Sequence, residues 1–386
     1  MVRTFLAAGL ALLCGLCGWR SVRLATPITP DSAEYHFRLW QAQKEGVGNP
    51  SAELDRALAL NPRYTEAWIA RGLEAETSGD LKKAEASLLQ AAEVDRLYLP
   101  RWTLANFYVR ASELPQFWTW ARRAAEMAYD PAALFQLCWR ASDDAGEILQ
   151  QAIPDTPVLR EAYLDFLVRS NRLEAAGPLA VEISQRAGAS QLDLLLRYCD
   201  ALLARRQASP ALQVWNALAA RRIIPLVALD PRTGASLTNG DLAATPLRRG
   251  FDWRPARVEG AALSFNTGSR EMSLSLSGKQ PELCDFVEQY LPVIPNVKYH
   301  FRYRYRTQDL AVETGLVWSF VDGRSGAELA AGTLPASSSW NEQELDISTG
   351  SGSDFVRVLL RYRRPPGRMR AEGSVVFKRF ALERAG

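Results

Sequence analysis

Two runs of alternating arginines offer the clearest chemistry in this sequence. They are Arg302, Arg304 and Arg306 in the first run and Arg357, Arg361 and Arg363 in the second. Successive side chains of a β-strand point to opposite faces, so each run places its guanidinium groups on one face of a sheet. A guanidinium binds carboxylate and phosphate groups bidentately. If the two strands are neighbours, six such groups form a site for a uronate, a phosphate or an acidic side chain.

Two tryptophans and several acids bear on this hypothesis. Trp253 and Trp318 are expected to provide a stacking surface beside the arginines. The alternative is that nearby carboxylates pair with the guanidinium groups and leave an ordinary solvated face; these acids are Glu282, Asp285, Glu288 and Glu372. The predicted ligand-binding residues are therefore Trp253, Arg302, Arg304, Trp318, Arg361 and Arg363, with an acidic glycan as the candidate ligand.

Catalytic and metal chemistry find little support in the sequence. The two histidines, His36 and His300, fall in different predicted domains, so neither is expected to complete a nucleophile–base pair. Neither a Gly-x-Gly-x-x-Gly pattern nor a P-loop lysine occurs. Of the five cysteines, Cys14 and Cys17 lie in an apolar run, and the other three lack metal-ligand spacing. We expect a protein that is not an enzyme, with no catalytic residues, no bound metal and no cofactor.

Length and charge narrow the class of protein further. The chain has 386 residues, too many for one ordinary domain, and 47% of them are hydrophobic, enough for a sizeable core. The net charge is only +3, which argues against a nucleic-acid partner.

Residues 1–30 are predicted to form a targeting segment. Arg3 precedes an uncharged run from Thr4 to Trp19, which Arg20 ends. Such a run is typical of a signal anchor or a signal peptide. The absence of a small-x-small cleavage site favours an uncleaved transmembrane helix followed by a Pro-rich stalk; a cleaved signal and a lipid-modified cysteine stay open. All three place the bulk of the protein outside the cytoplasm, in the periplasm or at the cell surface.

Apolar residues recur at helical spacing from residue 31 to residue 225. Trp68 and Trp102 lie 34 residues apart, and the small and apolar positions Ala84, Leu88 and Ala91 follow Gly72 at second-helix spacing. We expect about six helical hairpins that stack into an α-solenoid, shortened between residues 131 and 156.

This pattern resembles the tetratricopeptide repeat, over roughly half of the chain. In that family the first helix of each hairpin lines a concave groove that holds a protein partner. The resemblance places six residues in such a groove: Glu66, Ile69, Leu73, Thr103, Phe107 and Arg110. The alternative for Ile69 and Phe107 is ordinary packing between repeats.

Beyond a linker at residues 226–236 the pattern changes to alternation. Tyr299, Phe301, Tyr303 and Tyr305 occupy one parity of a run whose other parity is polar. Such a run predicts a strand with one buried and one solvated face. Several further runs of this kind predict an antiparallel β-sandwich of the jelly-roll type over residues 237–386.

Short motifs of this second region resemble carbohydrate-binding modules with a galactose-binding-like jelly roll. The run Asn239-Gly240-Asp241 is similar to their opening, Trp340 to a tryptophan before a late strand, and residues 375–382 to their closing strand. The acids that hold a structural calcium in many such modules are replaced here by Ala243 and by Lys378-Arg379, so we expect no calcium.

The sequence thus predicts a multidomain α and β protein, helical repeats followed by a sandwich. We expect a membrane-anchored scaffold whose repeats dock a protein partner and whose sandwich binds a glycan, in polysaccharide assembly or export. The alternative is a scaffold for protein–protein interaction without sugar binding, since the sandwich fold also serves protein contacts.

Overall fold

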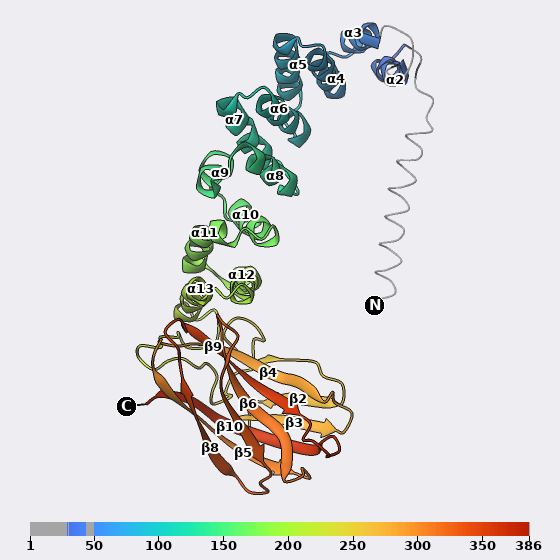
Figure 1. The fold of residues 1–386 in the computed structure, drawn as a ribbon. Coiled ribbons are helices and arrows are strands. Elements are labelled where there is room, and N and C mark those ends of the chain that lie inside the picture. The colour runs from blue at the N-terminus through green and yellow to red at the C-terminus, as the bar shows by residue number, and fades with distance from the viewer. Residues whose placement is uncertain (1–28, 30, 44–49, 386) are drawn as a thin grey trace. The chain divides into compact units, whose positions relative to one another are not determined.

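Helices form the first part of the chain and strands the second (Figure 1). The computed structural model describes residues 29, 31–43 and 50–385. The helices in these ranges are α2 (Ala33–Gln43), α3 (Pro50–Leu60), α4 (Thr65–Thr77), α5 (Leu81–Val94), α6 (Tyr98–Arg110), α7 (Leu114–Ala125), α8 (Ala132–Ala141), α9 (Ala145–Gln151), α10 (Pro157–Arg169), α11 (Leu173–Arg186), α12 (Leu192–Ala204) and α13 (Ala208–Ala220), with the 3-10 turn η1 (Ala189–Gln191). The predicted membrane run at residues 4–19 lies outside the described residues. Within them, every helix is too short or too polar to cross a bilayer.

Consecutive helices pack in the pairs α2–α3, α4–α5, α6–α7, α8–α9 and α12–α13, and Arg160 of α10 forms an ion pair with Glu182 of α11. Three contacts join residues that are 34 positions apart. Trp40 Nε1 donates to Glu74 Oε1 at 2.5 Å. Arg110 Nε donates to Glu76 Oε1 at 2.7 Å, and Arg221 Nε to the Ala187 carbonyl at 3.0 Å. The predicted period therefore appears as direct contacts between neighbouring pairs. The pair α8–α9 is short, as the sequence indicates, and the resemblance to the tetratricopeptide family stays a prediction.

Small residues allow the helices of a pair to approach closely. A Cβ atom on Gly72 of α4 would lie 2.6 Å from Leu88 Cγ of α5. Asp80 begins α5 as its N-cap, because its side chain accepts a hydrogen bond from the Lys83 amide at 3.0 Å. Gly79, with φ of +84°, supplies the left-handed turn just before it.

Two five-stranded antiparallel sheets form the second part, which confirms the predicted β-sandwich. The strands are β1 (Arg254–Pro255), β2 (Ala261–Asn266), β3 (Glu271–Ser277), β4 (Leu283–Pro292), β5 (Lys298–Gln308), β6 (Glu313–Asp322), β7 (Glu328–Pro335), β8 (Asn341–Ser348), β9 (Phe355–Arg363) and β10 (Glu372–Arg384). One sheet has the order β1-β4-β9-β6-β7, and the other β2-β3-β10-β5-β8. We call them the β4 sheet and the β5 sheet.

The core lies between the two sheets and is rich in aromatic rings. Phe301 of β5 meets Trp318 of β6 edge to face, with centroids 5.6 Å apart, and Phe320 in the same way at 5.0 Å. Tyr299, Tyr303 and Tyr305 are also buried, so the apolar parity of β5 faces inward as expected. Outward positions of β5 are left to charged side chains.

The chain divides into two compact units between residues 159 and 160, within α10. In the second unit α12 and α13 pack on the segment before β1. Asp200 Oδ1 accepts a hydrogen bond from the Gly250 amide at 2.8 Å and pairs with Arg254. The Trp215 ring meets Phe251 at 5.8 Å between centroids. The last helices and the sandwich are thus joined by the polar contacts of Asp200, which we call the hub, and by the apolar contact of Trp215 with Phe251. The boundary at residues 226–236 stays a prediction.

Candidate functional site

The two runs of arginines lie on different sheets. The residues Arg302, Arg304 and Arg306 belong to β5, and Arg357, Arg361 and Arg363 belong to β9. Since the sheets face each other through their apolar sides, the two runs point outward on opposite sides of the sandwich. The prediction of six guanidinium groups in one site is therefore wrong. Alternation within a strand shows which residues share a face, but it does not show which strands are neighbours.

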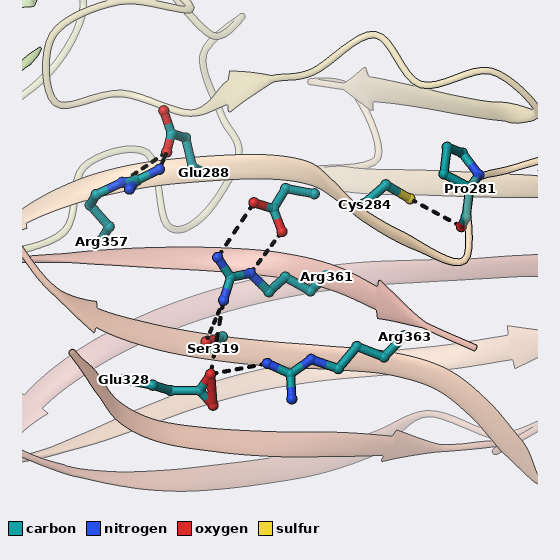
Figure 2. A network of polar contacts seen from close by, with 9 residues as sticks. Pro281, Cys284, Glu288, Ser319, Glu328, Arg357, Arg361 and Arg363 are labelled. Carbon is teal, nitrogen blue, oxygen red and sulfur yellow. Dashed lines mark hydrogen bonds and ion pairs between the residues drawn. The ribbon is translucent and has the colours of Figure 1, made fainter. Parts of the chain in front are cut away.

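Carboxylates of β4, the neighbour of β9, and of β7, two strands away, pair with the β9 arginines (Figure 2). The ion pairs are Arg357 with Glu288, Arg361 with Asp285 and Glu328, and Arg363 with Glu328. Burial is the largest single effect and lowers the pKa of Arg357, but the hydrogen bond with Glu288 and the negative charge of Glu288, with smaller effects of Tyr290 and Asp285, together raise it. On this face of the β4 sheet the structure therefore agrees with the alternative hypothesis, in which nearby carboxylates pair with the arginines. Its guanidinium groups already have their anions.

Trp253 and Trp318 cannot stack on a ligand. Both side chains are fully buried, and their rings lie 6.2 Å apart inside the sandwich. Trp253 Nε1 donates to the Asn239 carbonyl at 3.2 Å. The prediction of a stacking surface at these two residues is wrong, because a large aromatic side chain gains most free energy by filling the core.

A second group of cations lies on the outer face of the β5 sheet, around Trp340. The Lys378 ammonium is 3.7 Å from the Trp340 ring centroid, and the Arg306 guanidinium carbon is 5.0 Å from it. Arg304 stands directly opposite Lys378 in the β5–β10 register. Within residues 31–43 and 50–385, none of these three cations makes an ion pair. We call Arg304, Arg306, Trp340 and Lys378 the basic patch. Only Arg304 of this patch was among the predicted ligand-binding residues.

The opposite end of the same face is acidic. Arg302 bridges Glu344 of β8 and Glu383 of β10, with its Nη1 2.9 Å from Glu383 Oε2. The hydrogen bond to Glu344 raises the pKa of Arg302, which keeps its charge. His300 Nδ1 lies 2.9 Å from Glu344 Oε1 and 2.7 Å from Asp346 Oδ1. The charge of this face therefore changes along β5, from basic near Arg306 to acidic near His300.

The residues of the predicted partner groove lie on α4 and α6. Leu73 is 40% exposed, and Glu66 and Arg110 are also exposed. Thr103 and Phe107 are buried. The Thr103 hydroxyl donates to the Leu99 carbonyl of the same helix, and the Phe107 ring contacts the ring of Tyr108. Ile69 is half-buried. The accessible part of this surface therefore comprises Glu66, Leu73 and Arg110. Its role in binding a protein stays a prediction.

A cavity of about 690 Å³ opens between α5, α6 and α7. Its wall includes Trp120, whose ring lies 4.6 Å from the Arg123 guanidinium. Arg101 Nη1 donates to the Arg123 carbonyl at 2.8 Å and lies 3.6 Å from Glu126 Oε2. These polar groups bind one another, so the cavity is a polar recess between helices.

Comparisons with known proteins concern the sandwich. No family model matches the chain, and neither does any curated protein. Among solved structures, the chain is similar to a carbohydrate-binding module, CBM4, at 9% identity and a TM-score of 0.31, over 39% of this chain and 100% of that one. It is similar to the BiXyn10A CBM1 module at 13% identity and 0.27, over 38% and 95%. It is also similar to TmCBM61, solved with β-1,4-galactotriose, at 14% identity and 0.25, over 34% and 88%.

Proposed function

We propose that this chain is a non-enzymatic binding protein acting outside the cytoplasm, and that its sandwich binds a carboxylate-bearing glycan through the basic patch. The helical pairs would dock a protein partner, on the surface of α4 and α6 that exposes Leu73. The extracytoplasmic placement rests on the run at residues 4–19 and the Pro-rich stalk after it.

The observation that carries the proposal is the unpaired positive charge of the patch. Arg304 and Lys378 are directly opposite each other on adjacent strands, and Glu342 of β8 stands opposite Arg304 on its other side without forming an ion pair with it. Like charges in this position destabilise a sheet, by about 0.2–1 kcal/mol per pair. An anion between them removes the repulsion and forms charge-assisted hydrogen bonds. The β9 arginines, by contrast, are already neutralised by Asp285, Glu288 and Glu328.

The surface beside the patch fits a polyhydroxylated chain. Serines lie at outward positions of two strands, Ser264 on β2 and Ser273, Ser275 and Ser277 on β3. The register continues this row across β10 to the patch, since Ser264, Ser273, Val376 and Arg306 are successive partners. Hydroxyl groups both donate and accept hydrogen bonds, as sugar hydroxyls do. An acidic polysaccharide lying across these strands would have its hydroxyls over the serines and a carboxylate over the cations.

Affinity measurements on the full chain test the proposal. We would titrate oligogalacturonate, and a neutral cello-oligosaccharide of equal length, by calorimetry. We expect binding of the acidic oligosaccharide only. Arg304→Gln should weaken it by about tenfold to a hundredfold, which corresponds to one charge-assisted hydrogen bond of about 1.5–3 kcal/mol. Arg363→Gln, on the opposite sheet, is the matched control and should bind as the wild type does.

Two results would contradict the glycan assignment. Absence of oligogalacturonate binding, or equal losses in Arg304→Gln and Arg363→Gln, would remove the patch as a glycan site. Binding of a poly-glutamate peptide but not of the oligosaccharide would favour the alternative, a scaffold for protein contacts whose patch docks an acidic segment.

A further inference from the structure

Both histidines of this chain contact two carboxylates, but the geometry of the two clusters differs. His36 meets Glu53 through Nδ1 at 2.6 Å and Asp31 through Nε2 at 2.9 Å, so its acids lie on opposite sides of the ring. At His300 both carboxylates approach the same nitrogen, Nδ1, at 2.9 Å from Glu344 and 2.7 Å from Asp346. Convergence on one nitrogen is the arrangement that a single ion can use.

The strand pairing fixes this convergence. His300 of β5 stands directly opposite Asp346 of β8, and Glu344 lies two residues before Asp346 on the same outward face. One ligand atom from each of the three residues lies within 4.8 Å of the other two. Their side chains are 29%, 40% and 79% exposed for His300, Glu344 and Asp346, so an ion can enter from solvent.

We propose that His300, Glu344 and Asp346 bind a zinc ion at the acidic end of the β5 face. Imidazole nitrogen and carboxylate oxygen are both zinc ligands, and three protein ligands with one water make a tetrahedral site. Tetrahedral ligands at zinc distances stand roughly 3.3 Å apart, so the exposed carboxylates need to open by roughly half an ångström. An imidazole ligand favours zinc over calcium and magnesium, which prefer oxygen donors alone.

The surrounding charges suit a divalent cation. Glu383 of β10 pairs with His300 in the β5–β10 register, which adds a third carboxylate to the cluster. Arg302 contributes one positive charge, so the carboxylates and the guanidinium together leave a charge of −2 around the ring nitrogen. Arg302 also binds Glu344 through Oε2, which leaves Oε1 directed toward His300. This contact orients the ligand in the way that outer-shell partners orient metal ligands.

Zinc here would tie the edge of the sheet to its interior. β8 is the outermost strand of the order β2-β3-β10-β5-β8, and only β5 pairs with it in that sheet. A metal bond between His300 of β5 and the two β8 acids fixes this pair in its register. We therefore expect zinc to raise the melting temperature of the chain as well as to bind it.

The test uses the full chain without a polyhistidine tag, in a Cys14→Ser/Cys17→Ser background, because thiolates also bind zinc. Zinc affinity is measured by competition with a chromophoric chelator after metal removal. We expect the parent chain to bind one equivalent of zinc. His300→Gln should lower the zinc affinity by about 100-fold or more, since changes even to outer-shell partners lower metal affinity 10- to 100-fold. Asp346→Asn should show a similar loss, and at an exposed position it should leave folding intact. His36→Gln and Glu342→Gln are controls that should bind as the parent does.

Each other outcome overturns the proposal. A parent chain that takes up no zinc at 100-fold excess over protein has no such site. Equal binding by the parent, His300→Gln and Asp346→Asn places the ion elsewhere, and a loss in His36→Gln would assign it to the other histidine. Circular dichroism and metal-free melting of each variant separate loss of a ligand from loss of the fold. Cobalt substitution adds a check, because a visible spectrum without thiolate charge-transfer bands is expected from nitrogen and oxygen donors.

Discussion

Replacing Gly250 with alanine should loosen the contact between α13 and the sandwich. Gly250 has φ of +58°, and a Cβ atom there would lie 2.5 and 2.6 Å from two ring carbons of Trp215. The left-handed backbone costs an alanine about 1–2 kcal/mol. Displacement of a fully buried tryptophan adds about 1–3 kcal/mol of overpacking. The sum is a destabilisation of about 2–5 kcal/mol.

Gly326 offers a matched control in the same unit. Its φ is +78°, and nothing lies within 4 Å of its would-be Cβ atom. Gly326→Ala should therefore carry the backbone cost alone, about 1–2 kcal/mol. A double variant, Gly250→Ala with Trp215→Leu, should recover part of the loss because the smaller side chain vacates the space.

Hydrogen exchange with peptide-level resolution is the suitable assay, since a chain of several units does not unfold in one step. We expect Gly250→Ala to speed exchange in peptides from α12, α13 and residues 237–254, and to leave those from α4 to α7 unchanged. If amide exchange in these peptides is no faster in Gly250→Ala than in Gly326→Ala, the close packing of the Trp215 ring against Gly250 is refuted.

Two further predictions concern ionisable side chains. Hydrogen bonds to Glu53 and then to Asp31 raise the pKa of His36; the stabilisation of the α2–α3 pair is thus complete below the unfolded pKa of about 6.5 and is lost as pH rises through the higher folded value. Hydrogen exchange in α2 should accelerate across that window in the wild type but not in His36→Gln, and a flat wild-type profile would contradict this. Burial raises the pKa of Cys138 to about 12 and that of the buried Cys199 as well; both should resist iodoacetamide at pH 8 until urea unfolds the chain, as mass spectrometry would show, and labelling of the native chain would argue against their burial.

Periodicity predicted the helices and the face assignments of β5 because both are local properties. The inward row from Tyr299 to Tyr305 and the outward row of arginines follow from alternation alone. The same rule places Trp318, which shares its parity with Leu316 and Phe320, in the core, where the structure has it. Treating Trp318 as a stacking surface therefore set aside a signal that the sequence contained.

The positions of the ligand groups depend on pairing between distant strands, which local patterns do not report. Lys378 meets Trp340 across 38 positions of sequence, and His300 meets Asp346 across 46. From the sequence, Trp340 stood out only as the tryptophan before a late strand, and nothing local indicated that it lies beside Lys378. A bulge between Lys378 and Ala381 also shifts the register of β10, so that its outward residues do not follow simple alternation. Such contacts emerge only when the strand order is known.

The hub at Asp200 has a consequence for how this protein can be recombined. A cut within residues 226–236 would separate the sandwich from α12 and α13, although the change in sequence pattern suggests that place for it. The excised sandwich would carry Arg254 without its carboxylate, and Phe251 without the Trp215 ring that covers it. A gene fusion that moves the sandwich to another protein would therefore keep its fold best by taking the last helical pair along.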